Sequence, residues 1–172
     1  MSLMGGAMRP LRLFIIVSAL GLWMSAPPCW AGVREGVVAY KQGDFATAVR
    51  ELLPLAQHGD GEAQFYLGTM ATKGWGVPQD DAEAAHWYRR AAMQGMAEAQ
   101  YNLGAMYARG AGVPQDLVQA YYWLQLAATR FPSGGNHDKA VRARDQVAVQ
   151  LTPEQLVQAQ ALVRQWSPHQ EP

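Results

Sequence analysis

The residue types that most often carry out catalysis are scarce and poorly spaced in this sequence. Beyond residue 31, the only serines are Ser133 and Ser167, and neither matches the Ser-x-x-Lys or Gly-x-Ser-x-Gly pattern of an activated serine. The four histidines, at positions 58, 86, 137 and 169, form no pair spaced to bind one metal ion from one helix. No carboxylate spacing indicates a working acid–base pair. The sequence therefore predicts no catalytic residue, no metal site and no cofactor.

The sequence does contain residues that could bind a carboxylate. Lys73 and Arg109 are 36 residues apart. Each is the last of four residues that follow one another at spacings of three or four positions. Such steps keep a set on one face of a helix. The two sets are Glu62, Tyr66, Thr69 and Lys73, and Glu98, Asn102, Ala105 and Arg109. Two cations on neighbouring turns could bind an acidic group. Alternatively, they are solvated residues that the helix dipole favours near helix C-termini.

Three tryptophans could stack against a ligand. Trp87 and Trp123 recur at the same place on an apolar helical stripe, which favours a position in the core. Trp75 lies between two glycines, where the next copy of the pattern has Ala111, so it is the candidate for an exposed contact. These Gly-x-Gly segments follow no strand and precede no Lys-Ser/Thr, so turn geometry explains them better than phosphate binding.

The 36-residue spacing extends through the middle of the chain. Phe65-Tyr66-Leu67-Gly68 corresponds to Tyr101-Asn102-Leu103-Gly104, and residues 65–100 and 101–132 form two copies of one pattern. A degenerate copy precedes them, with its inter-helix loop reduced to Gln42-Gly43-Asp44. A fixed period of this length is typical of a stacked repeat, in which each unit buries its apolar face against its neighbours.

Each repeat predicts two helices. The first covers Glu98–Arg109 and ends at Gly110, a residue type common at helix C-termini. Gly68 and Gly104 fall inside such helices, which indicates close approach of a partner helix. The second helices begin at Asp80 and Asp116, each with Glu or Gln three residues later, the spacing of a capping box.

After the repeats, two further helices are predicted at residues 138–150 and 152–166, and no strand pattern competes. The second of these begins with the capping sequence Thr152-Pro153-Glu154-Gln155.

The N-terminus has the order of a secretory signal. Arg9 and Arg12 precede an apolar run over 13–23, and Cys29-Trp30-Ala31 predicts cleavage after Ala31. An uncleaved anchor, a buried helix, a start at Met8 and lipid attachment at Cys29 are the alternatives, although prolines before Cys29 disfavour the last. After cleavage the chain would lack cysteine and carry a formal charge near −2, so neither disulfides nor a basic surface for nucleic acid is expected.

The sequence from Ala97 to Gly104, with Gly110, residues 112–116, Ala120 and Trp123, resembles the Sel1-like repeat, a variant of the tetratricopeptide helix pair. The resemblance covers residues 36–129, and residues 138–166 resemble more loosely the helices that close such proteins. It implies an all-α, right-handed α-solenoid of tetratricopeptide-like helix pairs with C-terminal capping helices. The expected division is a signal peptide at 1–31, repeats at 32–132 (36–64, 65–100 and 101–132), and capping helices with a short tail at 133–172.

The resemblance also implies a function. Members of the family hold other proteins, often in the bacterial envelope, so we expect a non-catalytic scaffold, periplasmic or secreted, with a protein or peptide partner. Neither nucleic-acid binding nor stable membrane insertion after cleavage is expected, and the oligomeric state stays open. In tetratricopeptide relatives the first helices line a concave groove, and Asn102 matches the position where peptide-binding relatives use Asn. The predicted partner-binding residues are Tyr66, Lys73, Asn102, Arg109 and Trp75.

Two other functions remain open from the sequence. Some Sel1-like proteins are linked to β-lactam binding, so a β-lactamase-like or other hydrolase is one alternative. The cysteine pairs of those relatives are missing here. The other alternative is a purely structural subunit of an envelope complex, which would expose an apolar edge when isolated.

Overall fold

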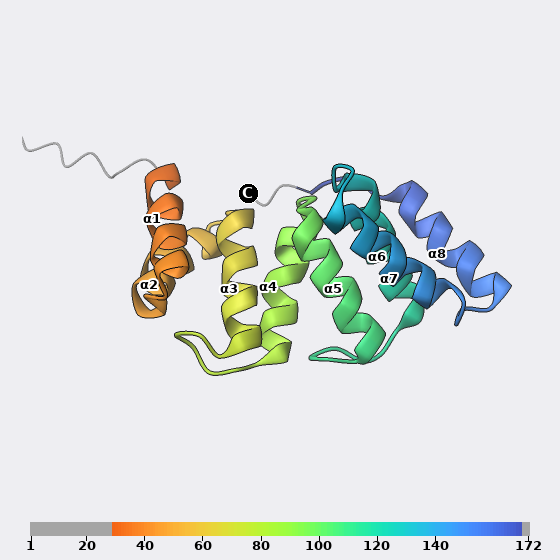
Figure 1. The fold of residues 1–172 in the computed structure, drawn as a ribbon, viewed down its shortest axis with the longest axis horizontal. Helices are drawn as coiled ribbons and strands as arrows, with labels where there is room; N and C mark the ends of the chain where they lie inside the picture. The colour runs from red at the N-terminus through yellow and green to blue at the C-terminus, as the bar shows by residue number, and fades with distance from the viewer. Residues whose placement is uncertain (1–28, 170–172) are drawn as a thin grey trace, which may run out of the picture.

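The computed structural model describes residues 29–169, which form eight α-helices and no strand. The prediction of an all-α solenoid is confirmed. Figure 1 shows the helices side by side in a row that follows the order of the chain. Their bounds are α1 Cys29–Gln42, α2 Phe45–Gln57, α3 Gly61–Lys73, α4 Asp81–Met93, α5 Ala97–Arg109, α6 Leu117–Arg130, α7 Gly135–Ala148 and α8 Pro153–Gln165.

The stack is built from helix pairs that contact mainly their sequence neighbours. α1 packs with α2, α3 with α4 and α5 with α6, while α2–α3, α4–α5 and α6–α7 contacts join successive pairs. Because each pair depends on its neighbours, the core follows the chain as a series of local clusters.

Glycines allow the two helices of each pair to approach closely. A Cβ at Gly36, Gly68 or Gly104 would lie 2.5–2.8 Å from a side chain of the partner helix. The side chains they meet are 36 residues apart: Leu52, Tyr88 and Leu124. The predicted close approach at Gly68 and Gly104 is therefore confirmed, and Gly36 is a third case that sequence reasoning missed. Gly36 precedes Gly68 by 32 residues rather than 36, because Leu52 follows Gly36 by 16 positions whereas Tyr88 follows Gly68 by 20.

The second helices begin where predicted, but their capping boxes are only half formed. The Asp80 side chain accepts hydrogen bonds from the N–H groups of Ala82 and Glu83, at 2.8 and 3.0 Å. The backbone N–H of Asp80 donates to Ala71 O, and that of Asp116 donates to Tyr107 O, both at 3.0 Å. The expected return bonds from Glu83 and Gln119 are therefore wrong, because the preceding helix already supplies the acceptor. At Thr152 both halves of the box are present.

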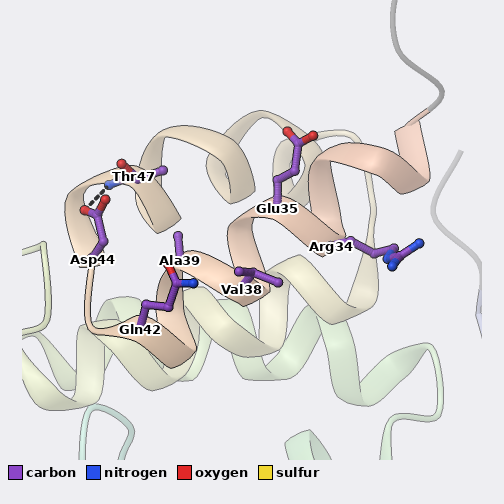
Figure 2. Close-up of a pocket in the computed structure, with 7 residues that line it drawn as sticks. All are labelled: Arg34, Glu35, Val38, Ala39, Gln42, Asp44 and Thr47. Atoms are coloured by element: carbon purple, nitrogen blue, oxygen red, sulfur yellow. Dashed lines mark hydrogen bonds between the residues drawn. The ribbon is translucent and has the colours of Figure 1, made fainter.

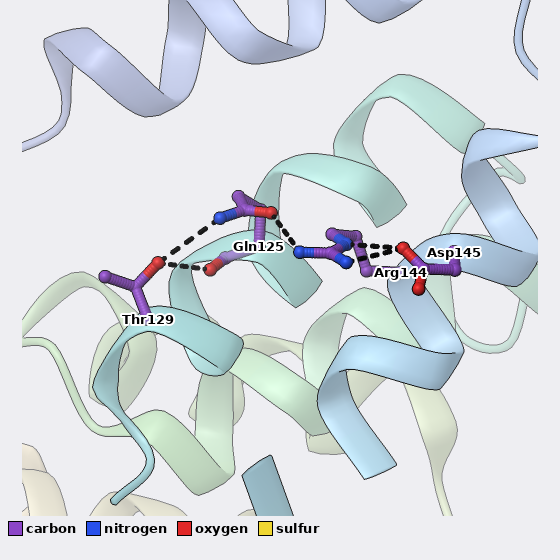
Figure 3. A network of polar contacts seen from close by, with 4 residues as sticks. All are labelled: Gln125, Thr129, Arg144 and Asp145. Carbon is purple, nitrogen blue, oxygen red and sulfur yellow. Dashed lines mark hydrogen bonds and ion pairs between the residues drawn. The ribbon is translucent and has the colours of Figure 1, made fainter. Parts of the chain in front are cut away.

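The last two helices both pack on α6. Arg144 of α7 donates to Gln125 of α6 at 2.9 Å and pairs with its neighbour Asp145, while Thr129 donates to the Gln125 carbonyl (Figure 3). α7 begins three residues earlier than predicted. α8 ends at Gln165, so that Trp166 is an extended C-cap residue rather than part of the helix.

The predicted signal peptide lies outside the described residues except for Cys29–Ala31, which form the first turn of α1. Among residues 29–169, no helix combines the length and the apolar character needed to span a bilayer.

Candidate functional site

A cavity of about 370 Å³ opens between α3 and α5, and we call it the α3–α5 cavity. Three of the five predicted partner-binding residues, Lys73, Asn102 and Arg109, line it together. The other lining residues are Thr69, Thr72, Asp81, Tyr88, Tyr101, Ala105, Met106 and Ala111.

Two equivalent helix ends position the cations. Lys73 is the last residue of α3 and Arg109 the last of α5, and each is followed by a glycine with φ of 70°. This left-handed conformation is easy only for glycine, and it turns the chain away from the helix end. The repeat therefore places two cations on neighbouring first helices.

Three polar side chains of the cavity make no hydrogen bond or ion pair within the described part of the chain, so they could bind a partner. Within residues 29–169, Lys73, Asn102 and Arg109 form no side-chain hydrogen bond or ion pair. Asp81 contributes one carboxylate to the same wall, which leaves the cavity with two cations against one anion. Its chemistry suits a ligand with carboxylate oxygens and backbone amides.

The cavity also has a fixed hydroxyl network. Tyr88 of α4 donates to Thr69 Oγ1 at 3.1 Å, and Thr72 Oγ1 donates to Gly68 O at 2.8 Å. The Tyr88 ring packs against Gly68. The missing side chain at Gly68 therefore allows α3 and α4 to approach closely and also places Tyr88 in the cavity wall.

Tyr66 and Trp75, the other two predicted residues, lie outside the cavity lining in an aromatic cluster with Tyr40 and Phe45. Trp75 stacks on Phe45 with ring centroids 4.8 Å apart, and Tyr66 contacts Tyr40 at 4.8 Å. Trp75 is 38% exposed, so one part of the ring remains open. Sequence reasoning missed Phe45 and Tyr40, whose only signal was their place beside the shortened loop.

Burial raises the pKa of Tyr66, and the nearby carboxylates of Glu62 and Glu98 raise it further. Burial also raises the pKa of Tyr40. Both rings are therefore neutral around pH 7, and the aromatic cluster offers apolar faces and hydroxyl groups without added negative charge.

Trp87 and Trp123 are buried in the core, as predicted, with 7% and 6% exposure. Their indole N–H groups differ. That of Trp87 donates to Glu83 at 3.3 Å, whereas that of Trp123 has no hydrogen-bond partner among residues 29–169. His86 lies on the surface, as expected.

A second hollow, of about 480 Å³, lies on the outer side of α1 and was not anticipated. Figure 2 shows its lining: Arg34, Glu35, Val38, Ala39, Gln42, Asp44 and Thr47. Counting from Gly36, Glu35 corresponds to Leu67 and Leu103, which are buried against the preceding helix pair. This hollow therefore marks the first end of the described stack, where a polar residue replaces leucine.

The chain is similar to proteins built from Sel1 repeats. The model of the Sel1 repeat matches residues 61–96 and 97–130. A crystal structure of a protective antigen present in uropathogenic Escherichia coli strains, displaying an SLR fold, matches with a TM-score of 0.73 and 33% identity. That match covers 81% of this chain and 30% of the antigen.

A Sel1 repeat protein from Oxalobacter formigenes matches with a TM-score of 0.62 and 37% identity, over 70% of this chain and 35% of that protein. The chain thus spans about a third of the length of these two structures. Among curated proteins, none matches significantly.

Proposed function

We propose that this chain is a non-catalytic scaffold for protein–protein interaction. Members of the Sel1 repeat family, whose model matches residues 61–96 and 97–130, generally serve as interaction modules of that kind. The observation that carries the proposal is the α3–α5 cavity, which brings together Lys73, Asn102 and Arg109. The polar groups of these three side chains have no partner among residues 29–169. The helix dipole would favour a cation at each of these two helix ends, but it gives no reason for the Asn102 amide to line the same hollow.

The partner is a protein segment that is extended or helical and has an acidic end. Lys73 and Arg109 bind its carboxylates, and Asn102 donates to and accepts from its backbone. The aromatic cluster, with Trp75 and Tyr66, supplies an apolar contact on the adjoining part of the same face. On this proposal, the first helices form the concave binding surface.

The predicted signal at residues 1–31 supports a place in the bacterial envelope, periplasmic or secreted, with a partner in the same compartment.

Peptide selection on the full chain tests the cavity. Random peptides with a free C-terminal carboxylate are selected on the unaltered protein, and the affinities of the recovered peptides are measured. For the double variant Lys73→Glu and Arg109→Glu, we expect affinities at least about tenfold weaker, because each reversed contact costs a charge-assisted bond.

The matched control reverses Lys139 and Arg142, two exposed cations of α7 that do not line the α3–α5 cavity. It imposes the same change in net charge and should leave the affinities unchanged. If both double variants lost affinity equally, the effect would be due to net charge, and the cavity would be refuted as the binding site. Peptides whose binding depends only on Trp75 would place the site on the aromatic cluster.

A further inference from the structure

The pair α1–α2 meets the pair α3–α4 at a first junction, and α3–α4 meets α5–α6 at a second. Residues that correspond to one another at these two junctions make different contacts. At the first junction, Gln94 donates from Nε2 to Gly59 O and to Gln64 Oε1, both at 2.9 Å. Gln64 in turn donates to Ala56 O at 3.0 Å. The buried glutamine thus has both ends of its amide satisfied by neighbouring elements.

At the second junction, the residues 36 positions later leave one acceptor unused. Gln100 is fully buried and donates to Ala92 O at 3.0 Å, but its Oε1 accepts no hydrogen bond within the described chain. The counterpart of Gln94 is Arg130, which lies against Gly95: a Cβ there would be 3.4 Å from Arg130 Nε. Arg130 therefore lies beside Gly95, the residue that corresponds to Gly59, but its guanidinium is held by other contacts.

The segment Trp166–His169, which we call the strap, holds Arg130. The guanidinium carbon of Arg130 lies 3.8 Å from the centre of the Trp166 ring, a close cation–π contact. The backbone N–H of His169 donates to Met93 O at 2.9 Å. Figure 1 shows the chain after α8 running back toward the middle of the row of helices.

The strap replaces contacts that side chains make at the first junction. There, the carbonyl of Gln57, which corresponds to Met93, accepts from Arg90 Nη2 at 3.3 Å. The counterpart of Arg90 is Leu126, which cannot donate. The second junction therefore depends on the strap for a bond that the first junction supplies within the repeat.

The docked strap does not close the surface completely. A hollow of about 230 Å³ remains between it and Arg89, Tyr122 and Trp123. The stacked guanidinium of Arg130 is partly buried, and this loss of hydration lowers its pKa. The docked position thus leaves a buried acceptor unsatisfied, a cation partly desolvated and a hollow unfilled.

We propose that Arg130 is a two-position switch that controls the strap. With the strap docked, Arg130 stacks against Trp166. With the strap released, Arg130 donates to Gln100 Oε1 and Gly95 O, as Gln94 does at the first junction, and Met93 O and the rings of Tyr122 and Trp123 become accessible. No residue of the strap lines the α3–α5 cavity, so this device is independent of the proposed binding site.

Amide exchange of the full chain, measured by NMR, tests the switch. In the unaltered protein the His169 amide should be protected. Trp166→Ala and Arg130→Gln should each reduce that protection, by about tenfold or more, because the cation–π contact is lost. In Trp166→Ala, the Arg130 Nε–H should also become slower to exchange, since Arg130 moves onto buried acceptors.

The second position is tested by removing its acceptor. Gln100→Leu should increase His169 protection, whereas Gln64→Leu, the same change at the first junction, should not. Should Gln100→Leu fail to fold, the Arg130 Nε–H signal in Trp166→Ala decides the question. An Arg130 signal that stays as exposed as in the unaltered chain, or His169 protection unaffected by Arg130→Gln, would overturn the switch.

Discussion

At the residue scale, Gly104 shows how a single missing side chain sets the spacing of two helices. A Cβ at this position would lie 2.8 Å from Leu124 Cγ and 3.1 Å from the backbone oxygen of Ala120. Alanine is favoured over glycine by about 1 kcal/mol in a helix, but overpacking costs about 1–3 kcal/mol. Because a backbone oxygen cannot rotate away, Gly104→Ala should lower the free energy of unfolding by roughly 1–2 kcal/mol.

Urea denaturation would measure this loss. Gly135→Ala is the matched control, since a Cβ there meets nothing within 4 Å and the residue is also helical. The control should be neutral or slightly stabilising. A Gly104→Ala variant as stable as the control would mean that α5 and α6 can separate at little cost.

A second residue-scale difference concerns the two core tryptophans. Glu83 accepts from the Trp87 indole, but Gln119, at the corresponding position, accepts no bond from the Trp123 indole, which has no partner in the described part of the chain. Gln119→Glu should therefore stabilise the fold by about 1 kcal/mol, the usual net contribution of one intramolecular hydrogen bond. A carboxylate near the start of α6 also gains from the helix dipole, so thermal unfolding is compared in a Trp123→Phe background. A gain of the same size in that background would show that the dipole, and not the indole, is responsible.

At the element scale, the second helix of each repeat is fixed by one aspartate. Asp116 accepts from the N–H groups of Val118 and Gln119, at 2.9 and 3.0 Å. Asp116→Ala should cost about 1–2 kcal/mol in unfolding free energy, because two helix-end donors lose their acceptor. Asp116→Asn keeps an acceptor oxygen and should lose much less, which chemical denaturation of the two variants can resolve. Similar losses in both would show that charge, and not the cap, stabilises this end of α6.

The elements themselves were predictable because their signals are local. Asp80, Asp116 and Thr152 mark helix starts through bonds to residues two or three positions away, and Gly110 marks an end through its own φ. The repeat then placed Lys73 and Arg109 on adjacent helices, one period apart. Their meeting with Asn102 in one cavity follows from that period, whereas their role in binding stays a prediction.

Contacts that break the period could not be predicted. Arg130 meets Trp166, which belongs to no repeat. Gly36 matches Gly68 only once it is known that Gly36 lies four positions nearer in sequence to the side chain it meets. The half-formed capping boxes have the same origin, since the acceptors Ala71 and Tyr107 come from the preceding helix and leave no mark beside Asp80 or Asp116.

At the scale of the whole molecule, a stack of repeats needs ends that do not bind one another. In α3 and α5, Leu67 and Leu103 are buried against the preceding pair, whereas α1 presents Glu35 at the corresponding position beside the half-exposed Val38. At this end of the described stack, a charged side chain therefore stands where the inner helix pairs have a buried leucine.

Glu35→Leu should therefore convert the outer side of α1 into a stacking surface like those inside the repeat. Leucine would join Val38 and Ala39 in lining the 480 Å³ hollow, and burying it against a second molecule removes apolar surface from water, about 1.5–3 kcal/mol per side chain. Sedimentation velocity should then show an average mass that rises with concentration above that of the unaltered chain, while Glu35→Gln, which removes the charge but adds no apolar surface, should not. If Glu35→Leu sediments like the unaltered chain at every concentration, the geometry of α1, and not Glu35, keeps this end from stacking.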